Sequence, residues 1–347
     1  TTHHSRPGQC TAPQQRLKRS NMPSASATNA SFPRFGTPKD EAPTAVHLLR
    51  RWSDIHPDND LYTWLGDEGE ETERRTYGNL QARANTIAAA LLTEWGCSKN
   101  DRAVLMYLPG LDFIEALWGC LLASVVAVPV YPVDLRKFKL SVGRFQGIVN
   151  SCTPTVALTH GAYRSMKRAM AIKTVLEPAS WPTGLVFHTT DDLPTQGNTR
   201  VFSMPSSEDL ALLQFTSCST GEPKGVMLSH GNVVHNLHAI AVAFDLSSDD
   251  VAVSWLPQYH DMGLLGYFVL PALLGGRVVC MSPMTFLRKP GLWLHTISKY
   301  RGTYLSAPNF AFQRCVDKLA DIRKKYPASE MHLEQLKGMP CRPVRLP

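Results

Sequence analysis

The chain has 347 residues, enough for about two domains of ordinary size; 44% of them are hydrophobic and 19% are charged. This composition can bury a core, which excludes disorder of the whole chain. Residues 1–45 and residues 314–347 each carry a net charge of +4, which leaves −1 of the total of +7 for the residues between them. The body of the chain therefore has no basic excess, and we predict that it has no nucleic-acid partner.

Eight cysteines are scattered along the chain, and no two of them have the spacing of a zinc knuckle or of a CxxC redox pair. This usage favours a reducing compartment, and we predict a cytoplasmic protein. The longest uncharged run, 116–133, is interrupted by Gly119, Ser124 and Pro129. We predict that it forms a buried helix followed by a buried strand, so that the chain has no integral membrane segment.

The two ends of the chain differ in composition from its middle. Residues 1–43 are rich in Ser, Thr, Pro and Ala and have no acidic residue before Asp40, which is typical of a disordered leader. A Ser-rich, acid-poor leader can also target an organelle, and this alternative stays open. We predict one folded region over 44–337 and a divergent, Pro-rich tail over 338–347.

Between these ends, hydrophobic periodicity predicts strands and helices in alternation. The predicted helices are 46–55, 77–95, 112–123, 140–152, 161–176, 231–244, 262–274, 286–300 and one that starts at 309. The predicted strands are 61–65, 73–76, 103–108, 125–130, 155–159, 184–189, 210–215, 225–228, 251–255, 277–282 and 303–306. Several strands lack alternation, as strands buried on both faces do. The prediction is an α/β fold with largely parallel sheets flanked by helices.

The loop between the strands 210–215 and 225–228 carries the strongest functional signal. It reads Thr216-Ser217-Cys218-Ser219-Thr220-Gly221-Glu222-Pro223-Lys224-Gly225. Hydroxyls and backbone N–H groups can donate to phosphate oxygens, glycine permits close approach, and a lysine supplies a mobile positive charge. The loop is not the P-loop of common ATPases, which requires GxxxxGK[ST] leading into a helix. The alternative is an ordinary polar hairpin.

This loop resembles the signature loop of the AMP-binding, adenylate-forming superfamily, which includes acyl-CoA synthetases, luciferases, peptide-synthetase adenylation domains and fatty-acyl-AMP ligases. One departure is Cys218, where the family usually has Gly; this puts affinity for ATP in question. The resemblance implies the N-terminal subdomains of the adenylate-forming fold over 44–337, as a partial AMP-binding domain. It also implies that the nucleotide phosphates contact Thr216, Ser217, Ser219, Thr220, Gly221, Lys224 and Gly225.

A second segment indicates the branch of the superfamily. Residues 255–264, Trp-Leu-Pro-Gln-Tyr-His-Asp-Met-Gly-Leu, resemble the corresponding segment of fatty-acyl-AMP ligases, as do the segments 107–113, 127–132 and 306–312. The resemblance implies that His260 acts near the reacting carboxylate and the α-phosphate, and that Lys224 is the second catalytic side chain. An imidazole can donate to a developing anion. The implied substrate-pocket residues are Tyr259, Asp261, Gly263, Pro308 and Asn309.

Neighbouring polar residues leave alternatives open. Asp261 either orients His260 or caps the helix that starts at 262. His230 is predicted to cap the helix at 231–244. None of the histidines is assigned as a metal ligand.

The implied reaction is the ATP-dependent activation of a fatty acid to an acyl-adenylate, followed by transfer to the thiol of an acyl carrier protein or of CoA. The implied cofactors are ATP and Mg²⁺. The family's C-terminal domain, with further catalytic groups, is absent from this sequence, and we expect a truncated fragment with negligible turnover. Two alternatives remain: an acyl-CoA synthetase, and a non-catalytic adenylation-like module that binds acyl groups or partners.

Overall fold

A computed structural model describes residues 44–134, 137–173, 181–195, 202–216 and 223–337, except for the side chains of 170–173. The chain divides into two compact units, Thr1–Arg34 and Phe35–Pro347. The first unit lies outside the described residues, all of which belong to the second. The predicted leader and tail also lie outside the described ranges, so both remain predictions.

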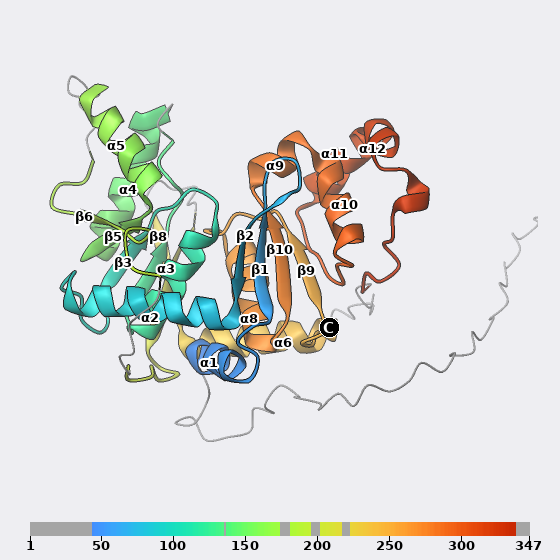
Figure 1. The fold of residues 1–347 in the computed structure, drawn as a ribbon. Coiled ribbons are helices and arrows are strands. Elements are labelled where there is room, and N and C mark those ends of the chain that lie inside the picture. The colour runs from blue at the N-terminus through green and yellow to red at the C-terminus, as the bar shows by residue number, and fades with distance from the viewer. Residues whose placement is uncertain (1–43, 135–136, 174–180, 196–201, 217–222, 338–347) are drawn as a thin grey trace, which may run out of the picture. The chain divides into compact units, whose positions relative to one another are not determined.

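The described strands form two sheets (Figure 1). Sheet A has the order β2-β1-β10-β9, and sheet B has the order β6-β5-β3-β4-β7-β8. The strands of sheet A are β1 (Asp60–Leu65), β2 (Glu71–Thr76), β9 (Val251–Ser254) and β10 (Arg277–Met281). The strands of sheet B are β3 (Arg102–Leu105), β4 (Val126–Pro129), β5 (Val156–Thr159), β6 (Val186–Thr189), β7 (Leu210–Thr216) and β8 (Lys224–Ser229).

The pairing of the strands confirms the predicted α/β class. Among the described strands, all pairs are parallel except the edge pairs β1–β2 and β7–β8, which are antiparallel. The helices are α1 (Ala45–Ile55), α2 (Tyr77–Thr93), α3 (Leu111–Leu122), α4 (Phe138–Cys152), α5 (Gly161–Lys173), α6 (His230–Phe244), α7 (Asp261–Gly263), α8 (Leu270–Leu274), α9 (Pro283–Arg288), α10 (Pro290–Lys299), α11 (Asn309–Asp317) and α12 (Leu319–Lys325). A π-helical segment, Leu264–Val269, joins α7 to α8, and a 3₁₀ turn covers Ala328–Glu330.

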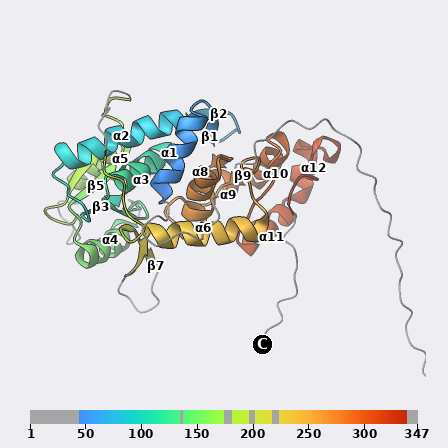
Figure 2. The same cartoon turned by 90° about the horizontal axis from the view of Figure 1, so that it is seen from below.

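The helices pack on the sheets through their apolar faces. Helix α2 packs on α3 and also contacts α1 and β2 (Figure 1). Figure 2 shows α6 as one long helix; it contacts β8 and, further along, the π-helical segment. The uncharged run 116–133 forms the buried end of α3 and the buried strand β4, as predicted. None of the helices in the described residues is long and apolar enough to cross a bilayer.

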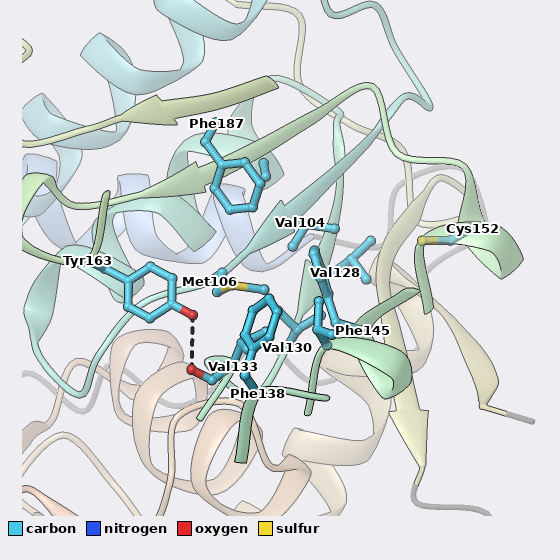
Figure 3. Close-up of a cluster of buried hydrophobic side chains, with 12 residues drawn as sticks. Val104, Met106, Val128, Val130, Val133, Phe138, Phe145, Cys152, Tyr163 and Phe187 are labelled. Atoms are coloured by element: carbon cyan, nitrogen blue, oxygen red, sulfur yellow. Dashed lines mark hydrogen bonds between the residues drawn. The ribbon is translucent and has the colours of Figure 1, made fainter. Parts of the chain in front are cut away.

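The core of sheet B is a cluster of buried side chains from β3, β4, β5, β6, α4 and α5 (Figure 3). Val104, Val128 and Phe145 are among its fully enclosed members. The polar end of Tyr163 is satisfied there, because its hydroxyl donates to the carbonyl of Val133 at 3.3 Å. The β-branched residues of the short strands fit such a surface, which explains why their sequence predicted buried strands.

The structure corrects three predicted elements. The predicted helix 262–274 is divided into α7, the π-helical segment Leu264–Val269 and α8. The predicted helix 286–300 is two helices, α9 and α10, because Pro290 has no N–H and its ring clashes with a continuing helix. The predicted strand 303–306 is a single bridge between Ala252 and Tyr304. The backbone N–H of Ser306 donates to the hydroxyl of Tyr267 instead of to a neighbouring strand, so the ladder does not continue.

Candidate functional site

The loop between β9 and α7 carries His260, and a buried glutamine fixes this loop in place. The Gln258 amide nitrogen donates to the carbonyl of Gly110 at 2.7 Å, and its amide oxygen accepts from the N–H of Gly110 at 3.0 Å. Gln258 is 3% exposed. Two of the segments that carry the family resemblance, 107–113 and 255–264, therefore meet through a pair of partly buried hydrogen bonds.

A second pair of contacts joins this loop to β7 and to the segment after β4. The side chain of Gln214 in β7 donates to the carbonyl of Tyr259 at 3.0 Å. The ring of Tyr259 lies edge-on to the ring of Tyr131, with centroids 4.6 Å apart. Burial raises the pKa of Tyr259 well above its usual value, so the phenol stays protonated. Gly110, Tyr131 and Gln214, from three distant parts of the chain, thus contact the loop.

His260 and Asp261 stand at the start of the helical run that continues through the π-helical segment to Leu274. The Nδ1 atom of His260 lies 2.7 Å from Oδ1 of Asp261, and their side chains are 66% and 63% exposed. Asp261 is the first residue of α7, and His260 occupies the N-cap position. The Asp261 carboxylate also accepts the N–H of Met262 at 2.7 Å. The sequence left open whether Asp261 orients His260 or caps the helix. The contact with His260 is present, and the cap position is occupied by His260 and not by Asp261.

Only the ends of the predicted phosphate loop are described. Thr216 and Lys224 face each other in the last described pair of the β7–β8 ladder, and Phe215 faces Gly225. A Cβ atom at 225 would lie 3.0 Å from the ring of Phe215, so this glycine permits close packing of the strand pair. Ser217, Cys218, Ser219, Thr220 and Gly221 lie outside the described residues, and their predicted roles remain predictions.

A cavity of about 340 Å³ lies beside Asp261. Its walls come from α6, from the helical run after His260, and from the segment 304–306. The lining residues are mostly apolar: Asn236, Ile240, Phe244, Leu246, Asp261, Met262, Leu265, Gly266, Tyr267, Leu270, Tyr304, Leu305 and Ser306. Met262 is 41% exposed, which places this end of the cavity at the surface. The size falls at the lower end of the ~300–1,000 Å³ typical of small-molecule pockets.

Three tyrosine hydroxyls hold the π-helical segment that forms one wall of the cavity. Those of Tyr62 and Tyr304 donate to the carbonyls of Phe268 and Gly266, the second at 3.0 Å. The hydroxyl of Tyr267 contacts the Oγ atom of Ser306 at 2.9 Å. The tyrosine hydroxyls thus give partners to the carbonyls of Gly266 and Phe268 where the helix is irregular, and Pro271, which has no N–H to donate, follows directly in α8. Burial raises the pKa of Tyr267 to about 12, so its phenol stays protonated at neutral pH.

Comparison with known proteins decides the family. The sequence matches the AMP-binding enzyme family over residues 49–345. The chain belongs to this family.

Relatives of this AMP-binding chain include fatty-acid ligases. It is 35% identical to the medium-chain-fatty-acid–[acyl-carrier-protein] ligase JamA of Moorena producens over 80% of this chain and 46% of that protein. It is 31% identical to the long-chain-fatty-acid–AMP ligase FadD23 of Mycobacterium tuberculosis over 79% of this chain and 47% of that protein. The chain therefore spans about half the length of the curated relatives it matches.

A solved structure agrees with these relatives. The fatty acyl-adenylate ligase of Legionella pneumophila, in complex with acyl adenylate and pyrophosphate, matches with a TM-score of 0.71 and 32% identity. The match covers 85% of this chain and 49% of that one. It confirms the adenylate-forming fold that the sequence predicted.

The predicted pocket residues of the AMP-binding chain divide into two groups. Asp261 lines the cavity. Gly263 is buried, and a Cβ atom there would lie 2.2 Å from the carbonyl oxygen of Pro257, so its role here is close packing. Tyr259 contacts Tyr131, as described above. Pro308 is the N-cap of α11 and Asn309 its first residue, and neither lines the cavity.

Sequence reasoning did not identify the cavity residues of α6. Asn236, Ile240 and Phe244 recur every fourth residue, which places them on one face of a helix. That spacing was a usable signal. The spacing does not predict which part of the chain this face of α6 contacts. The wall formed by Leu265 and Gly266 has no sequence pattern that predicts it.

The prediction that His230 caps α6 is wrong. Ser229 is the N-cap, and it forms a capping box with Asn232 in which each side chain accepts from the other residue's N–H. Serine outranks histidine as a cap because its short hydroxyl reaches the N3 amide. His230 is the next residue and is 1% exposed, and neither ring nitrogen has a hydrogen-bond partner. Burial lowers the pKa of His230 to about 4.

A second cavity, of about 410 Å³, lies at α2 and α3 and contains none of the predicted site residues. Its lining includes Arg75, Arg83 and the almost fully buried Glu115. Nε of each arginine donates to the Glu115 carboxylate, from Arg83 at 2.8 Å. Arg83 also donates to the carbonyls of Thr190, Leu193 and Pro194. These charges are matched internally, which indicates a structural cluster.

No metal-binding cluster was found where the chain is described: no group of three or more His, Cys, Asp or Glu side chains there could hold a metal.

Proposed function

We propose that this chain provides the ATP- and acyl-binding part of a fatty-acyl-AMP ligase. In the proposed reaction, the carboxylate of a fatty acid attacks the α-phosphorus of ATP. The bond to the departing pyrophosphate breaks, and an acyl-adenylate forms. The acyl group then passes to the thiol of an acyl carrier protein or of CoA, with release of AMP. The observation that carries the proposal is the apolar cavity that adjoins the His260–Asp261 pair within the family match.

The proposed roles follow from the chemistry of each group. A largely apolar cavity suits an aliphatic chain, and an exposed imidazole at its polar end can donate to a carboxylate or to a phosphate oxygen. Lys224 and the loop before it would contact the phosphates. Enzymes of this family use ATP with Mg²⁺. The ion would be held chiefly by the phosphates, whose charge it neutralises.

Positioning accounts for most of the proposed catalysis, because the carboxylate and the α-phosphorus react once they are held in line. The hydrogen bonds of Gln258 and Gln214 support this role. They join the loop that carries His260 to Gly110 and to β7, whose end leads into the phosphate loop.

Calorimetric titration with ATP tests the proposal directly on this chain. We expect binding, and we expect Lys224→Met to weaken it about tenfold or more, because a hydrogen bond to a charged group contributes ~1.5–3 kcal/mol and each 1.4 kcal/mol is tenfold. Lys318→Met, an exposed lysine at the α11–α12 junction, is the matched control and should leave the affinity unchanged. If ATP does not bind, or if both variants bind it equally well, the proposed nucleotide site is wrong.

Turnover and acceptor choice are separate measurements. The chain spans about half the length of its relatives, and the resemblance assigns further catalytic groups to their other half, so we expect negligible acyl-adenylate formation by this chain alone. Robust formation would contradict that expectation. In a longer form that is active, separate assays with CoA and with an acyl carrier protein distinguish an acyl-CoA synthetase from an acyl-AMP ligase. Acyl binding without ATP binding would favour the non-catalytic module.

A further inference from the structure

A glycine in the π-helical segment faces the apolar cavity with open space in front of it. Gly266 is one of the lining residues, and a Cβ atom added to it would meet no heavy atom within 4 Å. Its φ lies outside the left-handed region, so a residue with a side chain can adopt its backbone conformation. A larger residue at this position would therefore fill cavity volume without a backbone clash.

Gly263, one turn earlier, shows the contrast. There a Cβ atom would lie 2.2 Å from the carbonyl oxygen of Pro257, so the backbone itself requires glycine. At Gly266 no neighbouring atom lies close enough to exclude a Cβ atom. Its carbonyl is already held by the hydroxyl of Tyr304, and this contact does not involve a side chain at 266. The lack of a side chain at Gly266 therefore enlarges the cavity, and the packing of the helix does not depend on it.

We propose that Gly266 sets the length of acyl chain that the cavity accepts, so that this site takes fatty acids of medium length or longer. The inference rests on the proposed function, in which the carboxylate lies near His260 and Asp261. At about 1.5 Å per helical residue, Gly266 lies roughly 7 Å along the helical run from Asp261. Asp261, Gly266 and Leu270 follow one another along the wall of the cavity, so an acyl chain that runs along this wall from Asp261 reaches Gly266 before Leu270, and a short acid ends before Gly266.

The size of the effect follows from apolar burial. Each methylene removed from water changes affinity by about fourfold. A leucine side chain at 266 adds four carbons to the wall, and an acyl chain that loses contact for two or more methylenes binds at least about tenfold more weakly. An acid too short to reach position 266 keeps its contacts. The substitution should therefore change the ratio of affinities for long and short acids.

The test is calorimetric titration of the 347-residue chain with hexanoic acid and with dodecanoic acid, each below the concentration at which it forms micelles. For Gly266→Leu we expect dodecanoic acid to bind at least about tenfold more weakly and hexanoic acid to change by less than about threefold. Gly266→Ala should give a smaller loss in the same direction. Gly143→Leu is the matched control, because Gly143 is an exposed helical glycine of α4 that also has open space in front of it.

The outcomes separate this inference from the proposed function. Equal effects on the two acids, or none on either, overturn the role of Gly266 and leave the ATP-binding test with Lys224→Met untouched. If neither acid binds to the unsubstituted chain, the acyl site of the proposed function fails, and the inference fails with it. Thermal unfolding of each variant shows whether it is folded. If Gly266→Leu does not fold, the Gly266→Ala comparison decides, since it adds a single methyl group.

Discussion

Protonation of His230 should destabilise the fold as the pH falls. The ring is 1% exposed and has no hydrogen-bond partner for either nitrogen, and burial lowers its pKa from 6.5 to about 4. Between these two values the unfolded chain binds a proton that the folded chain does not bind, so stability is full above about pH 6.5 and is lost as the pH falls towards 4. The whole difference is about 3 kcal/mol, since one pKa unit corresponds to 1.36 kcal/mol.

Most of this loss falls in an accessible range. From about pH 7 to about pH 5 the His230 contribution changes by about 2 kcal/mol, because the unfolded-state histidine becomes protonated there while the buried one stays neutral. His230→Leu removes the titrating group at similar volume. It should cost little at neutral pH, because the ring nitrogens it replaces have no hydrogen bonds to lose.

The assay is urea unfolding of the two proteins at several pH values. Carboxylates also titrate in this range, so the informative quantity is the difference in unfolding free energy between the original chain and His230→Leu. We expect that difference to shift by about 2 kcal/mol in favour of the variant between pH 7 and pH 5. His235→Leu, an exposed residue of the same helix, serves as control and should keep the original pH dependence. Parallel pH profiles for the original chain and His230→Leu would refute the reasoning.

Two further substitutions test other parts of the framework. Gly263→Ala places a methyl group against the Pro257 carbonyl, and we expect a loss of ~1–3 kcal/mol in thermal unfolding, whereas Gly266→Ala should lose little; equal losses would show that the contact at 263 relaxes freely. Glu115→Gln removes the charge between Arg75 and Arg83, and we expect about 3 kcal/mol of destabilisation in urea at neutral pH because two arginines lose their shared partner; a loss below ~1 kcal/mol would show that other acceptors replace it.

The sequence predicted the elements of the fold well, because short Val-rich strands and amphipathic helices carry a local signal. Their ends were less certain. The strand predicted over 103–108 is shorter in the structure, where β3 ends at Leu105. Met106 is nevertheless fully buried, and its N–H donates to the carbonyl of Leu158. Because buried, hydrophobic residues continue beyond Leu105, the composition of the segment does not predict where β3 ends. The break at Pro290 could have been predicted from proline chemistry alone.

The site was less predictable than the fold. A local motif identified His260, but its main support, the contact between Gln258 and Gly110, joins residues 148 positions apart in the sequence. The cavity needs three segments to meet, and periodicity assigns each residue only to a face of its own helix. Nothing in the order of apolar residues distinguishes a π-helical turn from an α-helical one, so the wall at Gly266 required the structure.

The geometry of the site depends on the number of residues in the π-helical segment Leu264–Val269. The N–H of Leu270 bonds to the carbonyl of Leu265, five residues back, so the turn contains one residue more than an α-helix would use. Removing one residue between Leu264 and Val269 would restore regular hydrogen bonding and turn everything before it by about 100° relative to α8. His260 and the cavity wall would then lose their common orientation. A comparison of relatives that counts residues in this segment would detect such a change, whereas a comparison of residue types would miss it.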